Sequence, residues 1–227
     1  MPSRAAPVRL LALLAAAPLL MATNRCGVYI EQTENLQFFE PVTRVAFDVH
    51  HGSITGTMYP RPSVYIKRHT SGFEAGVGEF GHAVEGDEMQ LTGHCAIAHE
   101  CWYDHMIEAP PGTSLSFTFR DGYIELSEFD AEIHAEVGVG RFIGWAIAAP
   151  IVDLSYETGD VAIEFAATPE QVTIAVGTGD VTLTLPAGPY RCEVAPAAKL
   201  EGITCDEAAT AVLDITVETG AVTLRGV

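Results

Sequence analysis

Apolar and polar residues alternate in three copies of one short pattern in the C-terminal half of the chain. The copies read DLSYETGDVAIEF at 153–165, TIAVGTGDVTLTL at 173–185 and DITVETGAVTLRG at 214–226. In each copy, alternating apolar residues stand before and after a Thr-Gly pair. Because successive side chains of a β-strand point to opposite faces, each copy predicts two short strands with one apolar face, joined at the glycine.

Weaker copies extend the array toward the N-terminus. The strand starts predicted at residues 115, 133, 152, 172, 192 and 213 are separated by 18, 19, 20, 20 and 21 residues. A strand of five residues covers about 17 Å, so a step of about twenty residues makes one circuit of two or three strands with their turns. A fixed step predicts an all-β fold, a parallel β-solenoid with coils of about 20 residues.

The glycine of each Thr-Gly pair is expected to have a positive φ, where the chain turns from one strand to the next. An antiparallel sandwich would also alternate in this way, with turns every roughly 8–12 residues. The hairpin dipeptides Asn-Gly and Asp-Gly occur only once, at Asp121-Gly122, which favours the solenoid. Residues 57–92 show little periodicity and stay unassigned.

The N-terminus predicts export. Arg4 and Arg9 accompany 13 consecutive apolar residues at 10–22, a run that is too short for a membrane span and typical of a signal peptide. We therefore expect a signal peptide at 1–25, a linker at 26–40 and the solenoid domain at 41–227. Cys26 follows the apolar run and is the candidate for lipidation; removal with the signal peptide and a free thiol are the alternatives.

Charge and cysteine content narrow the partners and the compartment. With 12 Lys and Arg against 30 Asp and Glu, the net charge of −18 argues against nucleic acid and anionic membranes as partners. Membrane contact is then expected only through a lipid on Cys26. An exported chain meets an oxidising compartment, so we expect its other cysteines to form disulfides in the sequence-near pairs Cys95–Cys101 and Cys192–Cys205.

The segment GHCAIAHECWYDH, at 93–105, is the strongest candidate for chemistry. Its imidazoles and thiols could form a zinc or copper site, and the ligands of that alternative are His94, His99 and His105. No standard ligand spacing is present, so the Cys95–Cys101 disulfide is favoured. In that interpretation His105 alternates with its neighbours as a partly buried strand residue, and no cofactor is expected.

Two further sets of residues have simpler interpretations. His50 and His51 precede Gly52 at a predicted turn, where we expect them to be exposed. Asp160 and Asp180 occupy equivalent turns and are expected to stack as a solvated acidic edge, in preference to a calcium site.

The chain has no G-x-S-x-G or H-E-x-x-H motif, and its basic residues are too scattered for a polysaccharide-cleaving site. We expect no enzymatic activity.

The repeated TGDV, with LPAGPY at 185–190 and APPGTSLSF at 109–117, resembles a family of bacterial proteins labelled putative adhesins, which carry a domain of unknown function with T-G-S-G-D-V repeats. The resemblance covers roughly residues 40–227. It implies a right-handed β-solenoid at the cell envelope or in the periplasm, and it supplies no catalytic residues.

The expected partner of the solenoid is a protein, a glycan or a second copy of the chain. The predicted exposed face is rich in threonine, with Thr173, Thr182, Thr184, Thr216 and Thr223. A periplasmic metal-binding module is the alternative function.

Overall fold

The computed structural model describes residues 28–39, 42–97 and 100–227, which form one 16-stranded sheet of mixed parallel and antiparallel pairs and no helix. No helix in this part of the chain is long and apolar enough to cross a membrane. The predicted signal peptide, Cys26 and His99 lie outside the described residues. The strands are β1 (Tyr29–Phe38), β2 (Arg44–Met58), β3 (Val64–Phe73), β4 (Val77–Glu85), β5 (Glu88–Cys95), β6 (Cys101–Ala109), β7 (Ser114–Ser127), β8 (Ile133–Ile147), β9 (Ile151–Phe165), β10 (Gln171–Thr178), β11 (Val181–Leu185), β12 (Pro189–Ala195), β13 (Lys199–Glu201), β14 (Thr204–Cys205), β15 (Val212–Thr219) and β16 (Val222–Gly226).

Strand β2 and the strands from β7 onward form a parallel stack. Val161 of β9 pairs with Val181 of β11, twenty residues later, and Val152 pairs with Val172 at the same interval. The first half of β9 pairs with β10 and its second half with β11. The repeat therefore sets the pairing register of this part of the chain, as the sequence predicts.

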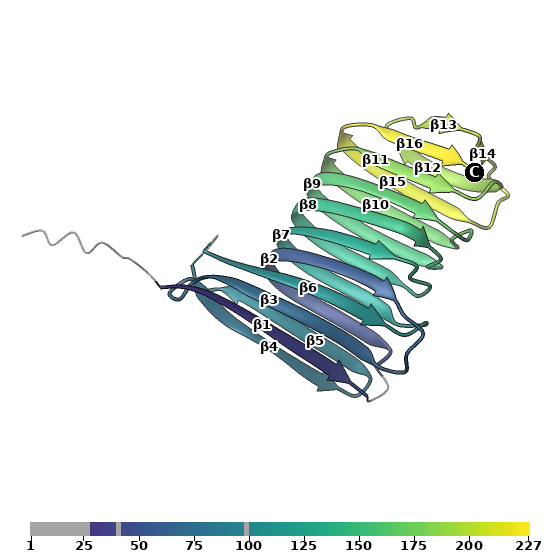
Figure 1. Cartoon of the computed structure of the whole chain (residues 1–227). Helices are drawn as coiled ribbons and strands as arrows, with labels where there is room; N and C mark the ends of the chain where they lie inside the picture. Colours follow the sequence, from purple (N-terminus) through teal and green to yellow (C-terminus); the bar gives the residue numbers. More distant parts are fainter. Residues whose placement is uncertain (1–27, 40–41, 98–99) are drawn as a thin grey trace, which may run out of the picture.

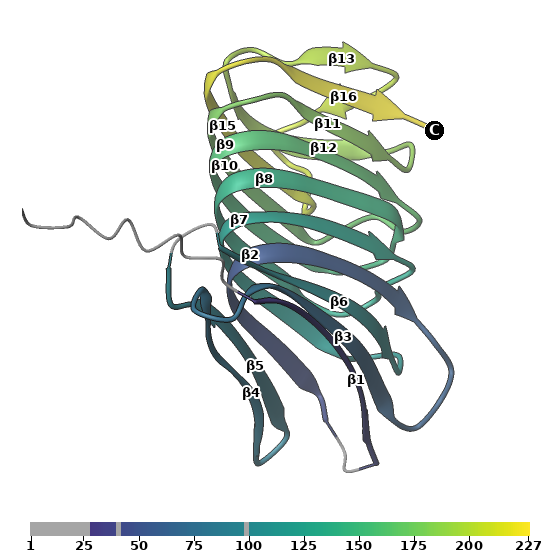
Figure 2. The same ribbon diagram turned by 60° about the vertical axis from the view of Figure 1, so that its left-hand side comes forward.

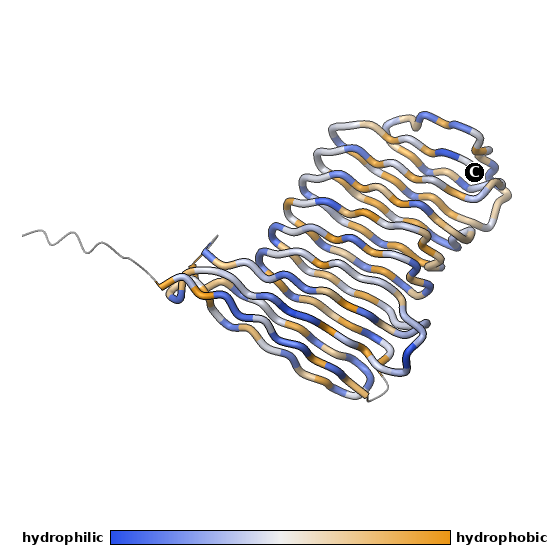
Figure 3. The backbone as a smooth tube through the Cα atoms, in the orientation of Figure 1, coloured by the Kyte–Doolittle hydropathy of each residue, from blue (hydrophilic) through white to orange (hydrophobic). Residues whose placement is uncertain are grey.

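The stack has two layers of strands (Figures 1 and 2). The back layer contains the first halves of β2 and β7–β9 with β10, β15 and β12; the front layer contains their second halves with β11, β16 and β13. Hydropathy alternates along each strand (Figure 3), and the apolar residues of the repeats are buried between the layers. Val172, Ile174, Val176, Val181 and Leu183 are all buried, so the predicted inward face is confirmed.

The glycines of the Thr-Gly pairs lie in a row where the strands pass from the back layer to the front layer. Gly159, Gly179 and Gly220 have φ of +154°, +149° and +147°. A Cβ on Gly179 would lie 1.9 Å from the carbonyl oxygen of Gly159, and one on Gly220 would lie 1.8 Å from that of Gly179. Glycine is required because successive repeats touch through their backbones, and because φ is positive.

The aspartates that follow these glycines bind the backbone of the next repeat in the stack. The Asp160 carboxylate accepts a hydrogen bond from the Asp180 backbone N–H, and the Asp180 carboxylate accepts one from the Ala221 N–H, both at 2.9 Å. The carboxylates do stack, and each one satisfies a backbone donor that the turn leaves without a strand partner. These contacts explain why aspartate recurs in the repeat.

The N-terminal end of the stack departs from the parallel pattern. Strand β1 pairs antiparallel with β3, β3 with β6, and β4 with β5. Residues 29–38, predicted to belong to a linker, form β1, and the unassigned segment 57–92 supplies β3, β4 and part of β5. Strand β2 lies between β7 on one side and β5 and β6 on the other. The excursion 59–113, which we call the N-terminal cap, thus covers the outer side of β2.

The C-terminal end is built in a corresponding way. Strand β15 lies between β10 and β12, and β16 lies between β11 and β13. The sequence prediction placed the segment that starts at 192 directly after the one that starts at 172, and this order is wrong. The excursion 186–211, which we call the C-terminal cap, covers the last repeat.

Candidate functional site

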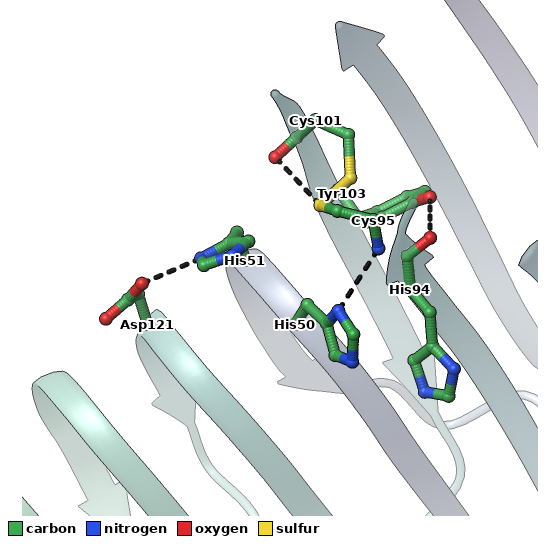
Figure 4. The surroundings of a disulfide bond; sticks show 7 residues. All are labelled: His50, His51, His94, Cys95, Cys101, Tyr103 and Asp121. Atoms are coloured by element: carbon green, nitrogen blue, oxygen red, sulfur yellow. Dashed lines mark hydrogen bonds and ion pairs between the residues drawn. A yellow bond between two sulfur atoms is a disulfide. The ribbon is translucent and has the colours of Figure 1, made fainter. Parts of the chain in front are cut away.

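The predicted chemistry-bearing segment lies where the N-terminal cap meets β2. Cys95 and Cys101 form a disulfide that joins the end of β5 to the start of β6 (Figure 4). Both strands pair with β2, whose residues His50 and His51 lie beside the disulfide. We call His50, His51, His94 and the disulfide the histidine–disulfide cluster.

His50 is held as a neutral hydrogen-bond acceptor in this cluster. Its Nδ1 accepts a hydrogen bond from the Cys95 backbone N–H at 3.2 Å, and its ring stacks on that of His94 with centroids 4.5 Å apart. Burial lowers the pKa of His50, and the positive charge of Arg120 and the His94 ring lower it further. A neutral imidazole is the form that can accept this bond.

The other two histidines contact carboxylates on opposite sides of His50. His51 Nδ1 lies 2.7 Å from Asp121 Oδ2, and His94 Nε2 lies 3.1 Å from Asp48 Oδ2. His51 is only 3% exposed, so the prediction of an exposed turn is wrong for this residue. The reason is that β2 continues from the back layer to the front layer without a loop at this point, which keeps His51 inside.

The predicted metal ligands are not brought together. In the described residues no group of three or more His, Cys, Asp or Glu side chains could hold a metal ion. His105 is 2% exposed and packs its ring against Phe47 in the core, with centroids 5.4 Å apart. Burial, with a smaller effect of Arg68, lowers the pKa of His105 to about 3, so it is neutral at pH 7. The structure does not favour the metal-binding alternative.

The second cysteine pair belongs to the C-terminal cap. Cys192 of β12 and Cys205 of β14 form a disulfide, and Tyr190 of β12 pairs with Cys205 in the sheet. Each cap therefore contains one disulfide. The histidine–disulfide cluster and the Cys192–Cys205 bond both act as clamps that hold an excursion of the chain against the end of the stack.

The back layer presents an acidic outer surface. A shallow groove of about 460 Å³ crosses it, lined by Arg120, Asp121, Glu136 and Glu157 among others.

The predicted threonine-rich face does not exist as one surface, because its members lie on both layers. Thr173 and Thr216 belong to β10 and β15 of the back layer, whereas Thr182, Thr184 and Thr223 belong to β11 and β16 of the front layer.

The front layer presents a smaller hollow of about 210 Å³. We call it the Trp145 hollow; the residues at its edge and floor include Arg141, Ile143, Trp145, Glu164, Thr184 and Arg225. Trp145 is 51% exposed, although large aromatic side chains are usually buried. Arg141 and Trp145 were not among the site residues predicted from the sequence. The signal was present, since an inward Phe142 places positions 141, 143 and 145 on the outer face of an alternating strand.

Comparison with known proteins supports the fold. No protein-family model matches the chain, and no curated protein matches it. A crystal structure described as a "putative cell adhesion protein" from Clostridium sporogenes aligns with a TM-score of 0.50 and 11% identity, over 88% of this chain and 100% of that one. This similarity shows a shared all-β fold.

More distant structures carry related descriptions. A "putative adhesin" from Bacteroides fragilis aligns with a TM-score of 0.39 and 12% identity, over 87% of this chain and 97% of that one. A "putative lipid binding protein" from Parabacteroides distasonis aligns with a TM-score of 0.35 and 9% identity, over 87% and 96%.

Proposed function

We propose that the chain is an exported, envelope-associated and non-enzymatic interaction module that presents its outer surfaces to a partner. The single observation that carries the proposal is the closed parallel stack. Its pairing register repeats over several strands, it exposes two long faces, and a cap covers each end. Successive strands lie about 4.8 Å apart, so side chains recur at fixed intervals over an extended surface.

The finer description of the fold belongs to this proposal. We take the stack formed by β2 and β7–β16 to be a right-handed β-solenoid with coils of about 20 residues. The parallel pairs twenty residues apart, the row of turn glycines and the two layers support this description. The antiparallel strands of the N-terminal cap then close the solenoid at one end.

Two features support an extracytoplasmic location. Both disulfides fit an oxidising compartment, and the Clostridium sporogenes protein of similar fold is described as a "putative cell adhesion protein". Attachment through a lipid on Cys26 would place the stack at the membrane surface without a spanning helix. Detergent extraction of cell fractions and palmitate labelling, with Cys26→Ala as the control variant, test this attachment.

The interaction function is tested by adhesion. Beads coated with the purified protein are expected to bind cell envelopes or extracellular glycoproteins more than beads coated with a globular protein of similar charge and size. Equal binding of both bead types would contradict the proposal. In parallel, release of new reducing ends from a panel of acidic and neutral polysaccharides would show an enzyme and contradict the non-enzymatic assignment.

A further inference from the structure

We propose that the Trp145 hollow binds a saccharide that carries a carboxylate group. The inference rests on the proposed interaction function and names the chemistry of its ligand. Three properties of the hollow carry it: an outward-facing indole ring, a half-buried floor, and an arginine without a carboxylate partner.

The backbone of β8 changes course where it presents Trp145. The pairing of β8 with β9 shifts between Gly144 and Ile147, so that three residue steps of β8 oppose two of β9. Ala146 has a φ of +50°, a left-handed conformation that is unusual for a residue with a side chain. Alternation from Phe142 places Trp145 on the outer face, and the bulge turns the next residue of that series, Ile147, inward, so that Trp145 is half exposed while Ile147 is buried. Its ring offers a flat apolar surface of the kind on which the C–H face of a pyranose stacks.

The floor of the hollow leaves room for one sugar ring. Ile143, Ala162 and Thr182 occupy adjacent register positions on β8, β9 and β11, and all three are half-buried. The volume of about 210 Å³ is below the roughly 300 Å³ at which pockets for drug-sized ligands begin. The Glu164 carboxylate and the Thr184 hydroxyl at its edge can hydrogen-bond sugar hydroxyl groups.

The charge at the hollow indicates an acidic sugar. Five arginines form ion pairs with glutamates: Arg44 with Glu88, Arg61 with Glu108, Arg68 with Glu34, Arg191 with Glu193 and Arg225 with Glu201. Arg120 and Arg141, by contrast, form no ion pair or side-chain hydrogen bond with any residue that the structure describes; Arg120 lies in the groove of the back layer, and exposed Arg141 lies at the hollow. A guanidinium group binds a carboxylate through two parallel hydrogen bonds, so a uronic acid stacked on Trp145 would pair with Arg141.

The same surface is a poor site for a protein partner. A stable protein–protein interface buries at least about 1,000 Å² and has an apolar centre. Trp145 is surrounded here by charged residues and half-buried threonines, and the other large exposed aromatic of β7 and β8, Tyr123, lies outside the hollow. A single stacked ring with polar groups around it matches a sugar better than a protein surface.

Tryptophan fluorescence and calorimetry test the proposal. The chain has two tryptophans, so Trp102→Phe leaves Trp145 as the only indole reporter. The probes are the trisaccharide of galacturonic acid, the neutral galactotriose as its counterpart, and acetate as a control for a bare carboxylate. We expect a saturable fluorescence change with trigalacturonate, and saturable binding of the same probe to the unmodified chain by calorimetry.

Two variants and one control separate the contributions to binding. Arg141→Gln is expected to weaken trigalacturonate binding about tenfold, the loss expected for one charge-assisted hydrogen-bonded contact, and to bring it close to that of galactotriose. Trp145→Ala is expected to abolish detectable binding of both trisaccharides. Tyr123→Ala, which removes an aromatic ring of β7 outside the hollow, is expected to bind as the unmodified chain does.

Several results would overturn the inference. They are no binding of trigalacturonate to the unmodified chain, equal binding of both trisaccharides, an identical response to acetate, or unchanged binding by Trp145→Ala. The bead assay distinguishes failure of this inference from failure of the proposed function. Adhesion by the Trp145→Ala protein at the unmodified level would refute the saccharide site and leave the interaction function standing, whereas no adhesion by the unmodified protein would refute the interaction function itself.

Discussion

The Gly179→Ala substitution places a methyl group where two successive repeats of the stack touch. An ideal Cβ on Gly179 would lie 1.9 Å from the carbonyl oxygen of Gly159 and 2.6 Å from its carbonyl carbon. Both atoms belong to the backbone, so no side chain can rotate away to relieve the overlap. The φ of +149° is in addition a conformation that alanine rarely adopts.

The expected cost follows from the bonds around this position. Moving these two repeats apart would disturb the two hydrogen bonds that join them here, from the Asp180 backbone N–H to the Asp160 carboxylate and from the Val161 N–H to Asp180 O, each 2.9 Å long. At about 1 kcal/mol for each bond and about 1–3 kcal/mol for backbone strain, the unfolding free energy should fall by about 3–5 kcal/mol.

Thermal unfolding followed by circular dichroism measures this loss. For a chain of this size, 1 kcal/mol corresponds to about 2–4 °C in Tm, so Gly179→Ala should lower Tm by about 6 °C or more. Gly188→Ala is the matched control: no atom lies within 4 Å of the Cβ that it adds, and its Tm should change by less than about 2 °C. Equal Tm values for the two variants would refute the explanation of the glycine row by backbone contact.

Three further predictions concern the aspartate contacts, the C-terminal cap and the buried histidine. Asp180→Ala removes the acceptor of the Ala221 N–H and should lower the unfolding free energy by about 1–2 kcal/mol in urea titrations; no loss would show that water replaces the carboxylate. Replacing Cys192 and Cys205 together with serine opens a closed loop worth about 3 kcal/mol, and hydrogen exchange should accelerate first in β12–β14; uniform acceleration over the whole chain would contradict a local clamp. His105 is expected to make the fold acid-sensitive. Its pKa is about 3 in the folded state and about 6.5 in the unfolded state, so the unfolded state binds the proton more tightly, and stability is lost as pH falls from about 6.5 to 3 at about 1.4 kcal/mol per pH unit. His105→Leu should remove this part of the slope in urea titrations at pH 8, 6 and 5, and an unchanged slope would contradict the assignment.

The repeat made the parallel stack predictable because its period encodes both the strand and the pairing register. The alternation over 152–165 and 172–185 identifies the inward residues, all of which are buried, and the twenty-residue interval identifies the partner of each. Positive φ at the glycine was also predictable. The contact between the Gly179 Cα and the neighbouring backbone was not, because the distance between repeats does not follow from the pattern within one repeat.

The site was harder to predict, because burial and partners decide what a titratable side chain does. His94 and His105 are eleven residues apart in a segment rich in possible ligands, yet one lies at the end of β5 and the other is enclosed in the core. The turn expected at His51 failed for the same reason, since a strand that passes from one layer to the other has no loop. Trp145 was the opposite case, because alternation alone places its side chain on the outer face.

The order of strands at the two ends follows from a need that the repeat cannot express. A parallel stack in chain order would end on an open row of backbone donors and acceptors, which pairs readily with another chain. In this protein the first and the last repeat of the stack each lie one position inward from its end. The N-terminal cap covers β2, and the C-terminal cap covers β15 and β16.

Hydrophobic spacing cannot distinguish this order of strands from chain order. Cys192 stands twenty residues after Val172 and twenty-one before Leu213, and Val172 and Leu213 are both inward positions. In the structure Leu213 pairs with both Val172 and Cys192, which leaves β12 one strand further out than chain order requires. The two disulfides lie in the two excursions, so the cross-links are in the segments whose position the repeat leaves undetermined.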